Sequence, residues 1–234
     1  MQEIVISFPA KKNATSTATL EALARDLAAA GDSPILLTGA GNVFSAGLDL
    51  EEVANLDAAR ARRLLDALEG IVEKLFLHPA PTVALVNGHA IAGGCVLALC
   101  CDHRVAAADP RARIGLNEVA AGLAFPPKTL AMIRARLGGP RAESVILGAR
   151  LHDPAGAREA GLVDEVAEDA RAVALARLEA LSRHPREAYA RAKHALRGGA
   201  LALSDAERRA FEAEVLPRWS SEETRAAALR LLGR

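Results

Sequence analysis

The sequence predicts an α/β fold with a helical C-terminal region, and three observations support this. Short apolar, β-branched runs alternate with helical patterns through the first half of the chain, an order typical of βαβ units. From Pro126 onward nearly every segment has helical periodicity, with one apolar interruption at Leu162-Val163. Hydrophobic residues make up 51% of the 234 residues, aromatic residues only 3%, and alanine is abundant. This composition favours closely packed helices over a β-sandwich.

The first third predicts strand, helix, strand and helix in turn. Residues 4–8 alternate polar and apolar side chains, as a half-buried strand does. A helix is expected over 17–30, because the breaker sequence Gly31-Asp32-Ser33-Pro34 follows it, and a strand is expected over 35–38. After a glycine-rich loop, Asp49 is a suitable N-cap for the next helical segment.

The middle third continues with a long helix and further short strands. Residues 60–77 keep an amphipathic helical period that Pro79 and Pro81 end. Residues 82–87 form an apolar strand, after which Gly93-Gly94 turns the chain into a helix that runs to Cys101. Two more strands are expected at 104–107 and 113–116.

Length and charge limit the classes of protein. With no internal repeat or low-complexity linker, we expect an α/β core over residues 1–167 and a helical region over 168–234 that packs on it. Lys plus Arg and Asp plus Glu are both 29, so nothing global attracts nucleic acid or an anionic membrane. The most apolar run, 90–101, is too short to span a bilayer, and the first residues have no signal-peptide pattern. A soluble cytoplasmic protein is expected.

The cysteines, histidines and large aromatic residues suggest structural roles. Cys95, Cys100 and Cys101 lie in one apolar run, and their odd number argues against a disulfide framework. Buried free thiols in a reducing compartment are expected. No histidine has metal-ligand spacing, so no metal site is predicted. Trp219 and Tyr189 are expected to pack rather than to recognise a base.

Two glycine-bearing turns are candidate binding elements. Ser45-Ala46-Gly47 and Ala92-Gly93-Gly94 each precede an expected helix, where unpaired N–H groups can face a cleft. Two such groups that converge on one oxygen make an oxyanion hole. The alternative is that the glycines only allow close strand–helix packing. A nucleotide loop at Gly39-Ala40-Gly41 is disfavoured, because neither Gly-Lys-Ser/Thr nor the dinucleotide glycine spacing follows.

Glu118 is the candidate general base. It stands among Leu116, Val119, Leu123 and Phe125, and apolar surroundings raise the pKa of a carboxyl group toward neutrality. The alternative is a surface glutamate that pairs with one of the many arginines.

Three motifs in this order resemble those of the crotonase (enoyl-CoA hydratase/isomerase) superfamily. They are Phe44–Leu50, Ala92–Cys95 with Cys101-Asp102 following, and Ile114–Glu118. The segments Val43–Leu50 and Gly115–Glu118 are most similar to the Δ3,Δ2-enoyl-CoA isomerase branch. The resemblance covers residues 3–167 and continues weakly beyond them. It implies a crotonase-like spiral of ββα turns, closed by C-terminal helices that also contact neighbours in a homo-trimer or hexamer.

The resemblance also implies a substrate and a reaction. An acyl-CoA would place its thioester oxygen between the N–H groups of Ala46 and Gly93, with Glu118 as the catalytic carboxylate. Val96 stands where the family's hydratases carry a second glutamate, so hydration should be weak or absent. One carboxylate can still move a proton from C2 to C4, and no cofactor is implied.

The resemblance implies further substrate-binding residues, by their positions in the motifs alone. The substrate-binding positions are Ser45, Gly47, Leu48, Gly94, Val96, Phe125 and Lys12. Lys12 matches a basic position near the CoA phosphates, although a solvated lysine is an equal alternative. The segment 122–127 should shape the acyl pocket, and Asp102 is expected to be a structural hydrogen-bonding group. Two alternatives stay open: another crotonase-type enolate reaction, such as decarboxylation or C–C bond formation, or a catalytically weak acyl-CoA-binding partner subunit.

Overall fold

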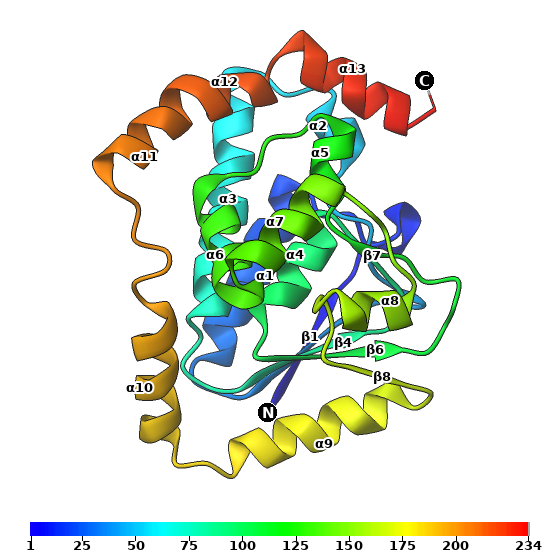
Figure 1. The fold of residues 1–234 in the computed structure, drawn as a ribbon, viewed down its shortest axis with the longest axis vertical. Coiled ribbons are helices and arrows are strands. Elements are labelled where there is room, and N and C mark those ends of the chain that lie inside the picture. Colours follow the sequence, from blue (N-terminus) through cyan, green and yellow to red (C-terminus); the bar gives the residue numbers. More distant parts are fainter. Residues whose placement is uncertain (234) are drawn as a thin grey trace.

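The computed structural model describes residues 1–233 as strands that alternate with helices and then a run of helices (Figure 1). The strands are β1 Gln2–Ile6, β2 Ile35–Gly39, β3 Val43–Ser45, β4 Thr82–Val86, β5 His89–Ile91, β6 His103–Ala107, β7 Ile114–Gly115 and β8 Glu165–Ala167. The α-helices are α1 Thr17–Ala30, α2 Leu50–Val53, α3 Ala58–Phe76, α4 Gly93–Cys100, α5 Glu118–Ala121, α6 Pro127–Leu137, α7 Gly139–Gly148, α8 Pro154–Glu159, α9 Ala170–Ser182, α10 Arg186–Arg197, α11 Asp205–Ala210, α12 Leu216–Trp219 and α13 Glu222–Leu231. A 3-10 turn, η1, spans Pro9–Lys11, and a π-helix, η2, spans Phe211–Val215.

The strands form two parallel sheets that the chain fills alternately. The larger has the order β1-β2-β4-β6-β8 and the smaller has the order β3-β5-β7. From β2 to β7, each turn of the chain therefore adds one strand to the large sheet and one to the small sheet. Parallel neighbours require crossovers, and the helices supply most of them. The α/β spiral expected from the sequence is confirmed.

Helices cover both faces of the large sheet. Helices α1, α3 and α4 lie on one side and α9 runs along the other (Figure 1). Strands β2 and β4 are buried along their whole length, as parallel strands covered on both faces are. Within residues 1–233, no helix is both long and apolar enough to cross a membrane.

The strand assignments differ from expectation at the shortest elements and at β1, which ends at Ile6 rather than at residue 8. Strands β3 and β5, of three residues each, were not expected, because such runs are too short to show a period. The apolar interruption at Leu162-Val163 precedes β8 and is not itself a strand. The expected boundary at residue 167 coincides with the end of β8. Helix α9 then packs on Leu36, Val83 and neighbouring sheet residues, so the C-terminal region supplies part of the core.

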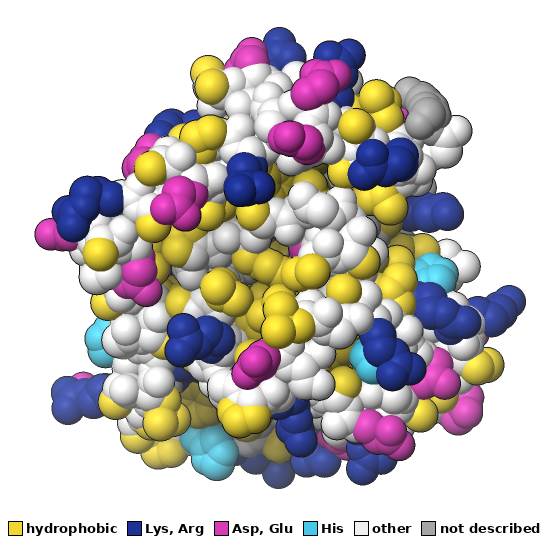
Figure 2. Space-filling model, turned by 45° about the horizontal axis from the view of Figure 1, so that its top comes forward, with side chains coloured by type: hydrophobic (Ala, Val, Ile, Leu, Met, Phe, Trp, Pro, Cys, Tyr) yellow, Lys and Arg dark blue, Asp and Glu magenta, His cyan; other side chains and the backbone are white. Residues whose placement is uncertain are grey.

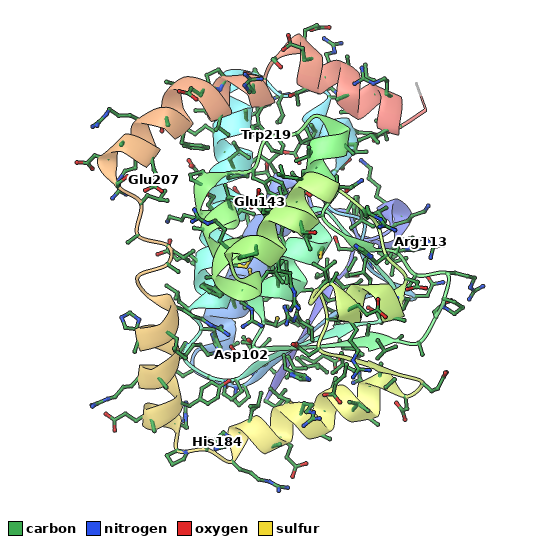
Figure 3. All side chains as sticks on the ribbon, viewed as in Figure 1. Asp102, Arg113, Glu143, His184, Glu207 and Trp219 are labelled. Carbon is green, nitrogen blue, oxygen red and sulfur yellow. The ribbon has the colours of Figure 1, made fainter. Side chains whose placement is uncertain are left out.

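A buried polar network attaches α10 to the core. The Asp102 carboxylate accepts hydrogen bonds from the Thr82 N–H at 2.8 Å, the Tyr189 hydroxyl at 2.8 Å and the Lys193 ammonium at 2.6 Å. Arg197 forms an ion pair with its other oxygen at 2.8 Å. Desolvation lowers the pKa of Lys193, although Asp102 opposes that shift. The structural role expected of Asp102 is confirmed (Figure 3).

The three cysteines are buried and free, as expected. Burial raises the pKa of each thiol. Because the thiolate is the reactive form, these side chains act as small hydrophobic groups.

Candidate active site

The three strands of the small sheet end at one edge and bring three distant segments together. Ser45 pairs with Ala90 and Ile91 pairs with Gly115, in parallel register. Because the carboxyl ends of parallel strands meet at the same edge, β3 leads into Leu48, β5 into Gly93 and β7 into Glu118. All three residues line one cavity of about 220 Å³, here called the site cavity.

The wall of the site cavity is mostly apolar. Its lining residues are Ala46, Leu48, Leu50, Leu68, Ile91, Ala92, Gly93, Val96, Asn117, Glu118, Ala121, Leu123, Ala124, Phe125, Pro126, Thr129, Leu151, Trp219 and Leu231. Hydrophobic side chains gather in a hollow across the middle of the face in Figure 2, beneath the C-terminal helices. An apolar pocket with a few polar groups is typical of a small-molecule site.

The turn after β3 is shaped by Gly47 and held by Thr15. Gly47 has φ +91°, and a Cβ there would lie 2.8 Å from the Ile91 carbonyl oxygen, so only glycine fits. The Thr15 N–H donates to the Gly47 carbonyl at 2.7 Å, and the Asp49 N–H donates to the Thr15 carbonyl at 3.0 Å. These two bonds form a parallel β-bridge, in which Gly47 and Asp49 both bond to Thr15. The N–H of Leu48, which lies between Gly47 and Asp49, therefore points away from Thr15.

The turn after β5 presents the start of α4. Ala92 has φ +50° and ψ −121°, a strained conformation of the kind that clusters at functional sites. The first bond of the helix runs from the Val96 N–H to the Ala92 carbonyl at 3.0 Å, so the N–H of Gly93 lies beyond the helical ladder. A Cβ on Gly93 would lie 3.6 Å from the Leu48 nitrogen. The two turns therefore meet at their amide groups.

The oxyanion-hole assignment of Ala46 is wrong. The Ala46 N–H donates to the Lys12 carbonyl at 3.1 Å, and the Gly47 N–H donates to Ser45 Oγ at 3.2 Å. Within residues 1–233, neither the Leu48 nor the Gly93 N–H has a protein acceptor. The available pair is thus Leu48 and Gly93. Sequence reasoning chose the wrong amide because contact with Thr15, thirty-odd residues earlier, decides which N–H of the turn is free.

Glu118 is a buried carboxyl group in the site cavity. It opens α5, is only 8% exposed, and its Oε2 has no hydrogen-bond partner in the described part of the chain. Desolvation raises its pKa to about 7, against a smaller opposing effect of its own backbone N–H. The alternative of an exposed glutamate paired with an arginine is excluded. A carboxyl group of this kind can accept and return a proton near neutral pH.

The other expected binding residues fall into two groups. Leu48, Val96 and Phe125 line the site cavity. Ser45, Gly47 and Gly94 instead build the turns beside the cavity. Ser45 Oγ donates to the Asn13 carbonyl at 2.8 Å. A Cβ on Gly94 would lie 2.4 Å from the Ser45 carbonyl oxygen. Lys12 is exposed and does not line the cavity, so its contact with CoA phosphates stays a prediction.

The C-terminal helices supply residues that the motifs did not reveal. Trp219 and Leu231 line the site cavity beside Leu123 and Phe125 of the expected 122–127 segment. The Trp219 indole N–H donates to the Ala124 carbonyl at 3.1 Å. Trp219 packs, as expected, but it packs as part of the cavity wall. The sequence predicts that it packs, and only the tertiary fold gives its neighbours.

A second hollow of about 470 Å³ lies beside α9 and α10, with Ser33, Pro79, His184 and Tyr189 among its lining residues. It lacks the combination found in the site cavity. The Tyr189 hydroxyl already donates to Asp102, and Arg186 donates to the Asp32 carbonyl at 2.9 Å. The smaller cavity is the candidate active site, because it holds the unpartnered carboxyl oxygen and the free amides.

Comparison with known proteins identifies the family. The model of the enoyl-CoA hydratase/isomerase family matches residues 1–230. The chain belongs to this family. The family resemblance of the three motifs is therefore confirmed, and the chain is an acyl-CoA enzyme of this family.

Relatives of this enoyl-CoA hydratase/isomerase family member carry both activities in their names. The chain is 34% identical over 177 residues to a putative enoyl-CoA hydratase of Thermus thermophilus, and the alignment covers 73% of this chain and 69% of the relative. It is 37% identical over 150 residues to mouse mitochondrial enoyl-CoA delta isomerase 1, covering 64% of this chain and 51% of the relative. The chain thus spans about half the length of that mouse protein.

Solved structures of the enoyl-CoA hydratase/isomerase family share the fold along most of its length. Human mitochondrial delta3-delta2-enoyl-CoA isomerase matches with a TM-score of 0.88 and 28% identity, covering 95% of this chain and 89% of that one. Another match, at 30% identity and a TM-score of 0.77, is described as an Mtb enoyl-CoA isomerase in its apo form and covers 91% of this chain and 93% of that one.

Proposed function

We propose that this protein moves the double bond of an enoyl-CoA from Δ3 to Δ2. One observation carries the proposal. Among the described residues that line the site cavity, Glu118 is the only one with an ionisable side chain. Val96 is 1% exposed and lines the same cavity, at the position where the resemblance places the second glutamate of hydratases. Isomerisation needs one proton acceptor that later becomes the donor, and Glu118 meets that need.

The proposed reaction begins with polarisation of the thioester. The Leu48 and Gly93 N–H groups donate to the thioester oxygen of a 3-enoyl-CoA. The Glu118 carboxylate then removes a C2 proton, so that negative charge spreads from C2 to the thioester oxygen and to C4. Each oxyanion donor typically stabilises such a transition state by about 3–4 kcal/mol.

The same carboxyl group completes the reaction. Protonated Glu118 returns its proton at C4, the C2–C3 double bond forms, and the thioester carbonyl is restored. Only a proton moves within the substrate, so we propose no metal or redox cofactor. A pKa near 7 suits both steps, because the group must accept a proton and release it again at the same pH.

The relatives named as hydratases make hydration the main competing outcome. Hydration requires a positioned water molecule that is deprotonated while the substrate carbon receives a proton. Val96 can neither hold water nor transfer a proton, and Glu118 is the one ionisable side chain among the described residues that line the cavity. We therefore expect conjugated product without addition of water.

The test uses 3-hexenoyl-CoA and purified protein. Conjugated-thioester absorbance follows isomerisation, and mass spectrometry detects added water. Glu118→Gln should lower turnover by at least about a hundredfold, in the range expected for loss of a general base. Glu143→Gln, which changes an exposed carboxylate on α7, should leave turnover unchanged. Unchanged turnover in Glu118→Gln, or hydrated product from the natural protein, would refute the assignment.

We further propose that the protein is a cytoplasmic homo-trimer or hexamer. The family resemblance supports this assembly, and exposed apolar side chains at Val119 and Leu147, 45% and 65% exposed, are suited to a subunit contact. Light scattering on the eluting protein measures the state directly. A monomer at micromolar concentration would contradict it.

A further inference from the structure

Trp219 joins the C-terminal region to the site cavity. It is the last residue of α12 and is 3% exposed. Its side chain lies on the inner side of that helix (Figure 3). The indole N–H donates a hydrogen bond to the Ala124 carbonyl at 3.1 Å, and this bond fixes one edge of the ring. The ring therefore forms a fixed part of the wall that also contains Phe125.

A π-helix sets the direction of Trp219. In η2 the Leu216 N–H donates to the Phe211 carbonyl, five residues back, instead of four. Pro217 follows at once; it has no N–H, and its ring crowds the preceding turn of an α-helix. The wider π turn accommodates Pro217 within one continuous helical path. It also brings Phe211, Leu216 and Trp219 inward, each 9% exposed or less.

Contacts on α3 hold this segment in place. Arg62 on α3 forms a two-point pair with Glu212 in η2, with one bond of 3.0 Å between Nη1 and Oε1. Leu68, on the same helix, lines the site cavity with Trp219. The position of the indole is thus tied to the element that forms the neighbouring part of the wall.

We propose that Trp219 limits the length of the acyl chain and makes the protein selective for short acyl-CoA thioesters. The inference rests on the proposed function, because it concerns the substrate of the same cavity. The site cavity has a volume of about 220 Å³, below the roughly 300–1,000 Å³ of most small-molecule pockets. It therefore suits a short acyl chain. Trp219 occupies the space that a longer chain would need.

Activity with two chain lengths tests the proposal. The measured quantity is the ratio of kcat/KM for 3-tetradecenoyl-CoA to that for 3-hexenoyl-CoA. Trp219→Ala should raise this ratio at least about tenfold, the discrimination that a hydrophobic pocket gives per excluded group. Phe211→Ala removes a buried aromatic ring from the same segment but not from the cavity wall, and should leave the ratio within twofold of the natural protein.

A binding measurement separates this proposal from the proposed reaction. Trp219 is the only tryptophan of the chain, so its fluorescence reports directly on occupancy of the cavity. Saturated hexanoyl-CoA should change the emission and bind more tightly than myristoyl-CoA, and Trp219→Ala, followed by calorimetry, should reverse that order. If both thioesters bind equally to the natural protein, or if Phe211→Ala shifts the order as much, Trp219 does not select chain length. If binding follows the prediction but no 3-enoyl-CoA is isomerised, the proposed reaction fails and the length selection stands.

Discussion

Replacing Glu118 with glutamine should make the protein inactive and, above neutral pH, more stable. Burial raises the pKa of this carboxyl group from 4.5 to about 7 in the folded protein. Below about pH 4.5 the carboxyl group is protonated in both the folded and the unfolded protein, so its titration does not lower the free energy of unfolding. As the pH rises from about 4.5 to about 7, the unfolded chain releases the proton and the folded chain retains it, so the free energy of unfolding falls. Above about pH 7 the group is ionised in both states, and the loss in free energy of unfolding no longer changes with pH.

The magnitude follows from the two pKa values. A difference of about 2.5 pH units corresponds to about 3 kcal/mol at 1.36 kcal/mol per unit. Glu118 is 8% exposed, so solvent screening reduces this little. Glutamine has nearly the same shape and no charge, and Glu118→Gln should therefore gain about 3 kcal/mol over the natural protein at about pH 8.5, with the gain shrinking toward about pH 5.

Urea denaturation at several pH values measures this difference, with Glu143→Gln as the control for an exposed carboxylate on α7. The buried glutamine amide also changes the free energy of unfolding, but by an amount that does not depend on pH. The pH dependence of the difference between the variant and the natural protein is therefore unaffected. In parallel, kcat/KM of the natural protein should fall about tenfold per pH unit below 7, because the base must be ionised. A pH-independent stability difference, or an activity midpoint near 4.5, would refute the argument that Glu118 is a desolvated base.

Three further changes test other parts of the structure. Gly93→Ala puts a methyl group at ordinary contact distance from the Leu48 amide, so the protein should fold but lose at least about a hundredfold in turnover; in Gly94→Ala the methyl group meets backbone at 2.4 Å and should lower the melting temperature instead. Val96→Glu adds a second carboxylate to the site cavity and should raise the activity midpoint through like-charge repulsion, with hydrated product now detectable by mass spectrometry; an unshifted profile would mean that the new group faces elsewhere. Lys193→Met removes one of the two cations that pair with the buried Asp102 carboxylate, and also the donor to the His78 and Ala80 carbonyls. It should cost about 1–3 kcal/mol in urea denaturation, whereas a loss below about 0.5 kcal/mol would show that the network is dispensable.

The longer elements could be predicted because their signals are local. Helix α1 spans Thr17–Ala30, the expected range, because Ser16 caps its start and Gly31 follows its end. Asp49 caps α2 as expected, accepting from the Glu51 N–H at 3.0 Å. Strands β3 and β5 could not be recognised, since three residues show no period and their pairing depends on each other.

The candidate site was predicted in its composition but not in its detail. Glu118 and Gly93 line the site cavity as expected, because sequence motifs fix which residues follow each strand. The second amide was misassigned because hydrogen bonds with the backbone of Thr15 and Lys12 decide which N–H remains free. Trp219 could not be placed by any local pattern, since its contact with Ala124 forms only when the C-terminal helices fold across the spiral.

The π-helix gives the C-terminal segment a one-residue register adjustment. An α-helix turns by about 100° per residue, so a substitution that returned Phe211–Val215 to α-helical hydrogen bonding, with no residue lost, would rotate everything after it by about that angle. Trp219 would then leave the wall of the site cavity, while the strands and Glu118, all earlier in the chain, kept their positions. Substitutions that remove this π turn could therefore change which acyl chains fit without any change in the residues that carry out the chemistry.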